Sequence, residues 1–244
     1  MTRPDPMLAV EDLSAWYGAA RILYDLAFEV GRGEVVALMG RNGAGKSTTM
    51  KAIMGLVGRR RGAVRFNGQD ISHAKPFEAA RLGLGFTPED RRIFSDLTVL
   101  ENLDIGRQPP RRFADGTPAP TWTADKLFAL FPNLGEMPHR PGDRMSGGEQ
   151  QMLAVARTLM GNPLLVLLDE PSEGVAPVIV EQMANTIVEL KKEGLSILLS
   201  EQNVHFAELV SDRVYMLEKG QIRWHGATGD LAGNIDMQRA YLTV

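Results

Sequence analysis

The chain has 244 residues, of which 44% are hydrophobic and 23% charged, so it is long enough for one sizeable globular domain or two small ones. A net charge of −3 excludes a global basic field for holding nucleic acid, and the lack of cysteine excludes disulfides and thiolate metal sites. No stretch approaches the roughly 20 apolar residues that span a bilayer, and residues 1–6 lack the apolar core of a signal peptide. We therefore expect a cytoplasmic chain whose contact with any membrane is made through a partner.

The first third of the chain alternates short apolar runs with turn residues. The pattern predicts strands at 8–13, 27–30, 35–39, 63–66 and 83–87, with helices at 49–54 and 76–82. From residue 89 to about 142 the character changes. Helical patches at 99–105 and 123–131 flank a loop, 108–120, which is rich in proline and charge and which we expect to be mobile surface without a function.

Strand and helix alternate again in the last hundred residues. The predicted elements are a helix at 146–160, a strand at 164–168, a helix at 177–192, a strand at 195–199 and a hairpin over 214–224. Alternation of this kind favours the α/β class, with a mainly parallel sheet interrupted by a helical insertion.

A glycine-rich stretch between a predicted strand and a predicted helix carries the strongest chemical signal. Gly40-Arg41-Asn42-Gly43-Ala44-Gly45-Lys46-Ser47-Thr48 fits the phosphate-loop pattern, and its strand–loop–helix context supports the match over a chance capping loop. Glycines let backbone N–H groups face a phosphate, Lys46 can reach the β- and γ-phosphates, and the Ser47 hydroxyl can ligate Mg²⁺. The nucleotide contacts predicted here are Asn42, Gly43, Ala44, Gly45, Lys46, Ser47 and Thr48.

Two acids follow the apolar strand at 164–168. A central strand can deliver Asp169 to the sheet edge beside Ser47, where its carboxylate can hold Mg²⁺. Glu170 points elsewhere and can orient and deprotonate the water that attacks the γ-phosphate. The alternative is that both acids are simply solvated at the end of a strand.

A third motif opens the helix at 146–160. Ser146 stands where an N-cap belongs, and Gly147 and Gly148 expose backbone N–H groups at a helix N-terminus. Alone this signal is weak, because any capped helix can have it. Its position between the phosphate loop and the Asp169 strand makes it more specific.

These motifs together resemble the ATP-binding subunits of ABC transporters over essentially the whole chain. Residues 40–48 are similar to the Walker A loop, 164–170 to the Walker B strand and 145–149 to the ABC signature. The resemblance implies one ABC ATPase domain over 1–244, with a nucleotide-binding core at 1–88 and 151–244 that includes an antiparallel β part, and a helical subdomain with the signature at 89–150. It also places the adenine-stacking aromatic at Tyr17, for which an ordinary core position is the alternative.

Two positions depart from the general pattern of that family. Glu89 stands where a Gln usually faces Mg²⁺ and the attacking water, and Gln202 replaces the switch histidine. Gln202 can hydrogen-bond a γ-phosphate oxygen but cannot supply a cationic donor. Together with Pro-Ser-Glu-Gly-Val-Ala-Pro at 171–177, these substitutions resemble an ATPase of the branched-chain amino acid uptake systems, with urea and amide importers as the alternative.

The resemblance implies partners as well as ATP and Mg²⁺. Two ATPase subunits, identical or paralogous, would meet head to tail, with residues 172–176 at their interface and each ATP held by Ser146 of the opposite subunit. A groove near Glu89 would receive a cytoplasmic helix of the permease on the inner face of a bacterial membrane, and a periplasmic binding protein would supply the solute.

Two rival functions belong to other classes. An ABC ATPase that acts on DNA or ribosomes usually carries coiled-coil insertions or basic arms, neither of which is found in this sequence. A small-molecule kinase would explain residues 40–47 but would leave the Ser146 motif without a purpose. We therefore expect no nucleic-acid partner.

Overall fold

The computed structural model describes residues 5–232, and the outermost residues of the domain predicted over 1–244 lie outside this range. The strands are β1 (Leu8–Tyr17), β2 (Ala20–Val30), β3 (Val35–Met39), β4 (Arg59–Phe66), β5 (Gln69–Asp70), β6 (Leu84–Thr87), β7 (Leu165–Asp169), β8 (Ser196–Glu201), β9 (Arg213–Glu218) and β10 (Gln221–Ala227). The helices are α1 (Lys46–Ile53), α2 (Pro76–Leu82), α3 (Val99–Gly106), α4 (Ala124–Leu130), α5 (Pro132–Gly135), α6 (Gly147–Met160), α7 (Pro177–Lys192), α8 (Val204–Val210) and α9 (Thr228–Ala232), with a 3₁₀ turn at Gly142–Arg144.

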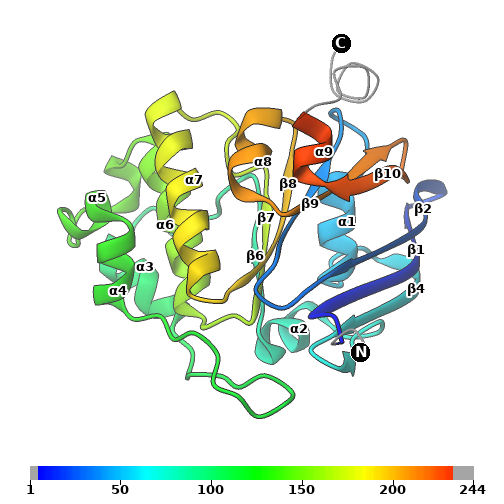
Figure 1. Ribbon diagram of the computed structural model, residues 1–244. Coiled ribbons are helices and arrows are strands. Elements are labelled where there is room, and N and C mark those ends of the chain that lie inside the picture. Colours follow the sequence, from blue (N-terminus) through cyan, green and yellow to red (C-terminus); the bar gives the residue numbers. More distant parts are fainter. Residues whose placement is uncertain (1–4, 233–244) are drawn as a thin grey trace.

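Two sheets form the framework of the molecule. The larger has the order β10-β9-β3-β8-β7-β6 and is parallel except for β10, which pairs antiparallel with β9. The smaller, β2-β1-β4-β5, is antiparallel and lies on the opposite side of the molecule from α3, α4 and α5 (Figure 1). The predicted fold class, a parallel core with an antiparallel β part and an inserted helical part, is confirmed.

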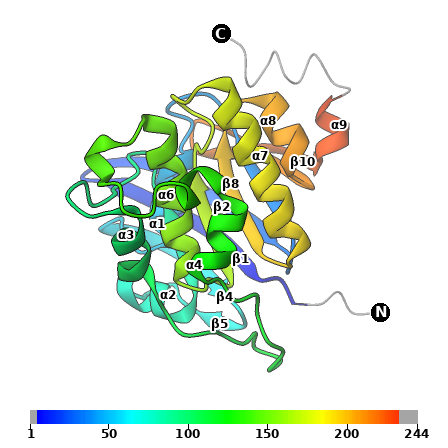
Figure 2. The same cartoon turned by 90° about the vertical axis from the view of Figure 1, so that its left-hand side faces the viewer.

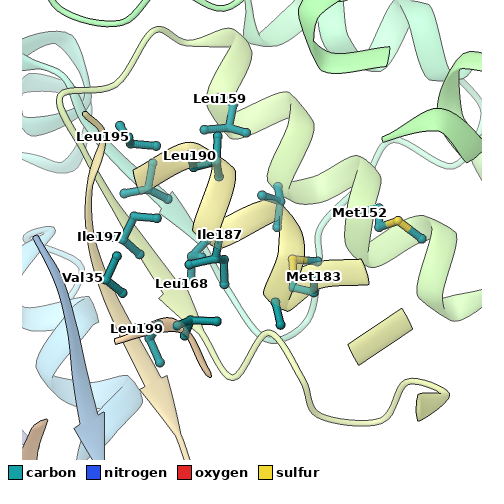
Figure 3. Packing of buried hydrophobic residues seen from close by; sticks show 14 of the residues in the cluster. Val35, Met152, Leu159, Leu168, Met183, Ile187, Leu190, Leu195, Ile197 and Leu199 are labelled. Carbon is teal, nitrogen blue, oxygen red and sulfur yellow. The ribbon is translucent and has the colours of Figure 1, made fainter. Parts of the chain in front are cut away.

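Successive side chains along the central strands point to opposite faces of the sheet, and each face packs into its own hydrophobic core. In β3, Val35, Ala37 and Met39 face one core, whereas Val36 and Leu38 face the other. The first core lies between the sheet and the helices α6 and α7, where Ile187 and Leu190 approach the strand side chains (Figure 3). Because both faces are covered, the strands are continuous apolar runs, which is the pattern of a buried parallel sheet.

The parallel arrangement brings four loops to one edge. The strands β3, β6, β7 and β8 all run the same way, so the residues that follow their carboxyl ends meet there. These are the phosphate loop after β3, Glu89 after β6, Glu170 after β7 and Gln202 after β8. Ligands of open α/β sheets bind at this edge.

The loop between α3 and α4 differs from the prediction. We expected 108–120 to be mobile surface, but Phe113 is 6% exposed and Ala119 is 8% exposed, and both belong to the second hydrophobic core. The loop extends from the helical part back toward the antiparallel sheet (Figure 2). Its aromatic anchor was hidden from sequence reasoning by the prolines and charges around it.

We call residues 108–122 the strap, because contacts fix it at both ends and near its tip. The Asn162 side chain accepts from the Trp122 backbone N–H at 2.6 Å and donates to the Gln108 carbonyl at 2.7 Å. Near the tip, the Arg32 guanidinium lies 3.5 Å from the centre of the Phe113 ring and forms an ion pair with Asp115 at 2.8 Å. The strap thus connects the helical part to the turn between β2 and β3.

Candidate functional site

The glycine loop closes over the start of α1. Gly40 has φ 157°, and a Cβ there would lie 2.3 Å from the Leu217 carbonyl oxygen, so the loop passes too close to β9 for any side chain. Gly45 caps α1 with φ 112°, a conformation that glycine adopts without strain. The backbone N–H groups of the first turn of α1 therefore open toward the sheet edge, as a phosphate site requires.

Lys46 is held inside this loop. Its ammonium donates to the Gly40 carbonyl at 2.8 Å and forms an ion pair with Glu170 at 3.0 Å, and both side chains are at least 94% buried. The cation predicted to meet phosphates is thus paired with the acid predicted to activate water. Phosphate oxygens entering the loop would compete with the Glu170 carboxylate for Lys46.

Asp169 ends β7 at the position expected from the sequence. Its carboxylate accepts a hydrogen bond from the Ser200 hydroxyl at 2.7 Å. Burial raises the pKa of Asp169, and hydrogen bonds from Ser200 and Ser47 oppose that rise. Ser47 and Asp169 therefore lie in contact across the start of α1 and the end of β7.

Ser200 was missed by sequence reasoning. Besides its bond to Asp169, its hydroxyl and its carbonyl accept from the Glu170 N–H at 3.0 and 3.2 Å. This serine therefore positions both acids from the neighbouring strand. A polar residue at the carboxyl end of a buried strand was the signal available in the sequence.

Glu170 adopts φ 49°, a left-handed conformation uncommon for a residue with a side chain. Its second carboxylate oxygen accepts from the Gln202 amide at 2.9 Å. Burial favours the neutral acid, but hydrogen bonds from Glu173 and Lys46 and the charge of Lys46 lower the pKa of Glu170 below its usual value. The structure thus brings Lys46, Glu170 and Gln202 into direct contact.

Glu173 adds a further carboxyl group to this cluster. Its hydrogen bond with Glu170, followed by partial burial and the charges of Glu170 and Glu89, raises its pKa to about 7. Glu89 itself is exposed just beyond β6. Its negative charge contributes to the raised pKa of Glu173. Its predicted contact with a metal stays a prediction.

The donor set at this edge suits Mg²⁺. Among residues 5–232 there is no group of three His, Cys, Asp or Glu side chains that could hold a metal ion by itself. A hydroxyl and a carboxylate in contact, Ser47 and Asp169, are oxygen ligands of the kind that Mg²⁺ uses when phosphates and water complete its octahedron. The residues present therefore fit a nucleotide-bound Mg²⁺ and do not form a separate metal cage.

The Ser146 motif lies at the start of α6 and is open. The Ser146 side chain is exposed and forms a capping box with Glu149, whose carboxylate accepts from the Ser146 N–H at 2.7 Å. Gly148 is buried, and a Cβ there would lie 2.7 Å from Ile179 of α7. Ser146 and Gly147 thus present a helix N-terminus that α7 supports from behind.

The two aromatic residues at the end of β1, Trp16 and Tyr17, have different surroundings. The guanidinium groups of Arg59 and Arg21 lie over the Trp16 ring, at 4.7 and 5.4 Å from its centre. Tyr17 is 49% exposed. Of the two rings, Tyr17 is the one available to stack on a base, and the role of an ordinary core aromatic does not fit its exposure.

A groove of about 620 Å³ lies between the core and the helical part. Three of its lining residues, Leu56, Phe94 and Ile105, are large apolar side chains that are about half exposed. Arg81 and Arg157 add positive charge to the same walls. None of the described helices is long and apolar enough to cross a membrane.

Comparisons with known proteins agree on one family. The family model described as "ABC transporter" matches residues 23–173. The chain is 41% identical over 236 residues to the high-affinity branched-chain amino acid transport ATP-binding protein BraG of Pseudomonas aeruginosa, covering 97% of this chain and 99% of that protein. It is 34% identical to the lipopolysaccharide export system ATP-binding protein LptB of Haemophilus influenzae, covering 97% of each.

A third relative is the probable branched-chain amino acid transport ATP-binding protein LivF of Archaeoglobus fulgidus, which is 34% identical over 92% of this chain and 94% of its own length. Among solved structures, an ATP-binding subunit of an ABC transporter superposes with a TM-score of 0.76 at 30% identity, covering 97% of this chain and 96% of that chain. The ADP conformation of an ATP-binding cassette of an ABC transporter gives 0.78 at 27% identity, covering 96% and 97%.

Proposed function

This chain belongs to the ABC transporter family as an ATP-binding and ATP-hydrolysing subunit, and on that premise we propose that it energises the uptake of branched-chain amino acids. The observation that carries the catalytic part of the proposal is the convergence of Lys46, Asp169, Glu170 and Gln202 at one edge of the parallel sheet. The Glu170 carboxylate contacts both Lys46 and Gln202. Ser200 links Asp169 to this group, because its hydroxyl bonds both the Asp169 carboxylate and the Glu170 N–H.

The chemistry follows from the position of each group. The loop from Asn42 to Thr48 and the Lys46 ammonium hold the phosphates, and the exposed Tyr17 ring stacks on adenine. Ser47 and Asp169 would hold Mg²⁺, which when bound would neutralise charge on the β- and γ-phosphates. The Glu170 carboxylate takes a proton from the attacking water, with Gln202 and Glu89 lining the same space.

The open signature turn supports a composite site. The N-terminus of α6 carries the exposed Ser146 and the partly exposed Gly147 on the surface of its own subunit, with the buried Gly148 behind them, and there it can meet the nucleotide of a second ATPase subunit. Backbone N–H groups and the helix dipole then complete the anion cage across the interface. The second subunit is either a copy of this chain or a paralogue.

The groove between the core and the helical part is the proposed contact with a permease. Its half-exposed Leu56, Phe94 and Ile105 suit the apolar face of a short cytoplasmic helix, and Arg81 and Arg157 suit an acidic residue on it. Through this proposed contact the chain would lie on the inner face of a bacterial cell membrane. A periplasmic solute-binding protein would deliver the cargo to the permease.

The proposed cargo rests on the relatives and not on any residue of this chain. The relatives named for branched-chain amino acid transport include the one at 41% identity, whereas the lipopolysaccharide export protein is at 34%. Urea or amide import is the second candidate, because the residues at 171–177 and Gln202 also resemble those systems.

ATP turnover by the purified chain tests the catalytic part of the proposal. We expect Mg²⁺-dependent release of phosphate that Glu170→Gln reduces at least about 100-fold, since the general base is lost. The control Glu181→Gln, an exposed acid on α7, is expected to hydrolyse ATP normally. Phosphoryl transfer to a metabolite in place of water would instead indicate a kinase.

Uptake by cells that produce the complete transporter tests the cargo. Replacing this subunit by its Glu170→Gln form is expected to stop the entry of labelled leucine. Normal leucine entry together with failed urea entry would reassign the cargo to the second candidate.

A further inference from the structure

The two carboxylate oxygens of Glu170 have different partners. Oε1 forms the ion pair with the Lys46 ammonium at 3.0 Å, and Oε2 accepts from the Gln202 amide at 2.9 Å. Phosphates that take Lys46 remove the partner of Oε1 only. The side chain can then keep one anchored oxygen while the other becomes free to meet water.

We call the contacts that hold Oε2 of Glu170 the anchor. Besides Gln202, the anchor includes Glu173, a residue that the proposed function does not use. The Gln202 Nε2 also lies 3.4 Å from Oε2 of Glu173, so one amide group bridges two carboxyl groups. Glu170 and Glu173 are themselves hydrogen-bonded, which requires a proton on one of them. Glu173, whose pKa is raised to about 7 by this hydrogen bond, by partial burial and by the nearby negative charges, is the partner that can carry it.

The local backbone explains why these carboxyl groups meet. The Glu173 N–H donates to the Glu170 carbonyl at 3.1 Å, which closes a turn directly after β7. Gly174 follows with φ 66°, a left-handed conformation that lets the chain leave the turn. The Glu173 side chain remains mostly exposed, so replacing it removes little buried surface.

We propose that Glu173 is a positioning residue for ATP hydrolysis, which together with Gln202 anchors one oxygen of Glu170 while nucleotide releases the other. This proposal rests on the ATPase function proposed above. It also gives Gln202 a specific role, because its neutral amide holds two carboxyl groups at once. Without Glu173, the Glu170 carboxylate released from Lys46 samples more rotamers, and fewer of them face the attacking water.

The kinetic test compares Glu173→Ala, Glu173→Gln and the control Glu181→Ala in the full-length chain. We expect Glu173→Ala to lower kcat by about 10-fold, while the Kd for mant-ADP, measured by fluorescence without turnover, changes less than about 2-fold. Glutamine can reproduce the hydrogen bonds of the protonated acid, so Glu173→Gln is expected to recover kcat to within about 3-fold of the wild type. Glu181→Ala should match the wild type.

Two kinetic results would overturn the proposal. One is a kcat for Glu173→Ala within about 2-fold of the wild type. The other is an equal loss in the Ala and Gln variants, which would mean that the hydrogen bonds do not carry the effect.

A thermal double-mutant cycle on the nucleotide-free chain gives an answer that does not depend on turnover. We expect the Tm shifts of Glu173→Ala and Gln202→Ala to depart from additivity by about 1–2 °C in the double variant, because both remove the same contact. Additive Tm shifts would show that Glu173 and Gln202 do not act together on Glu170, and would overturn the proposal. If the wild type hydrolyses no ATP, the proposed function fails, and this cycle still decides whether Glu173 and Gln202 are in contact as the anchor requires.

Discussion

Replacing Ser200 by alanine tests whether the strand beside β7 positions the acids of the site. The Ser200 hydroxyl donates to a carboxylate that is 2% exposed and also accepts from the Glu170 N–H. A hydrogen bond to a charged group contributes about 1.5–3 kcal/mol. For a chain of this size, each kcal/mol shifts the Tm by roughly 2–4 °C, so Ser200→Ala is expected to lower the Tm by about 3–12 °C. The Glu170 N–H keeps the Ser200 carbonyl as a partner.

The same strand offers a matched control. Ser196 is fully buried four residues earlier, and its hydroxyl accepts from the Gly33 N–H at 2.9 Å, away from the acids. Its neutral hydrogen bond contributes about 0.5–1.5 kcal/mol, so Ser196→Ala should lower the Tm less and leave ATP turnover intact.

Differential scanning calorimetry and phosphate release distinguish the two serine variants. Ser200→Ala is expected to lose both stability and turnover, because Asp169 and Glu170 lose a shared support. A Ser200→Ala variant that is as stable as Ser196→Ala and hydrolyses ATP at the wild-type rate would refute the reasoning.

Three further predictions concern the loop cation, the strap and the coupled acids. Lys46→Ala should weaken mant-ADP binding about 10–100-fold in a fluorescence titration, because a charge-assisted phosphate contact is lost, and unchanged binding would contradict the site. Phe113→Ala should cost about 3 kcal/mol, or roughly 6–12 °C in Tm, whereas Phe77→Ala, at an exposed ring, should cost far less; equal shifts would mean that the strap does not anchor the fold. The pKa of Glu173 is raised in the folded chain to about 7 from 4.5, so its stabilising contribution is full below pH 4.5 and is lost as the pH rises through 7. The Tm of nucleotide-free protein should therefore fall more between pH 5 and pH 8 in the wild type than in Glu173→Gln, and parallel curves would contradict the assignment.

The sequence predicted most elements because local pattern and tertiary environment agree in them. The strand expected at 35–39 and the helix expected at 76–82 have the predicted limits, since an apolar run in one case and a proline start with a glycine end in the other define them. The helix α8 (Val204–Val210) was missed. Its seven residues are too few for a clear period, and its Asn203 cap was interpreted as part of a motif.

Long-range contacts account for the remaining differences. Nothing local to residues 108–120 shows that Phe113 packs under Arg32, more than eighty residues earlier in the chain. The same holds for the site. Spacing identified Lys46 and Glu170, but the ion pair between them and the support from Ser200 depend on the pairing of β8 with both β3 and β7. Sequence motifs therefore identify the residues of this site, whereas the pairing of the strands determines which of their side chains are in contact.

The dependence of ATP turnover on subunit concentration tests the composite site most directly. If each nucleotide needs Ser146 from a second subunit, turnover per chain should rise with protein concentration, and Ser146→Arg should abolish it while mant-ADP still binds at Lys46. Turnover that is independent of concentration and insensitive to Ser146→Arg would contradict a site shared between two subunits.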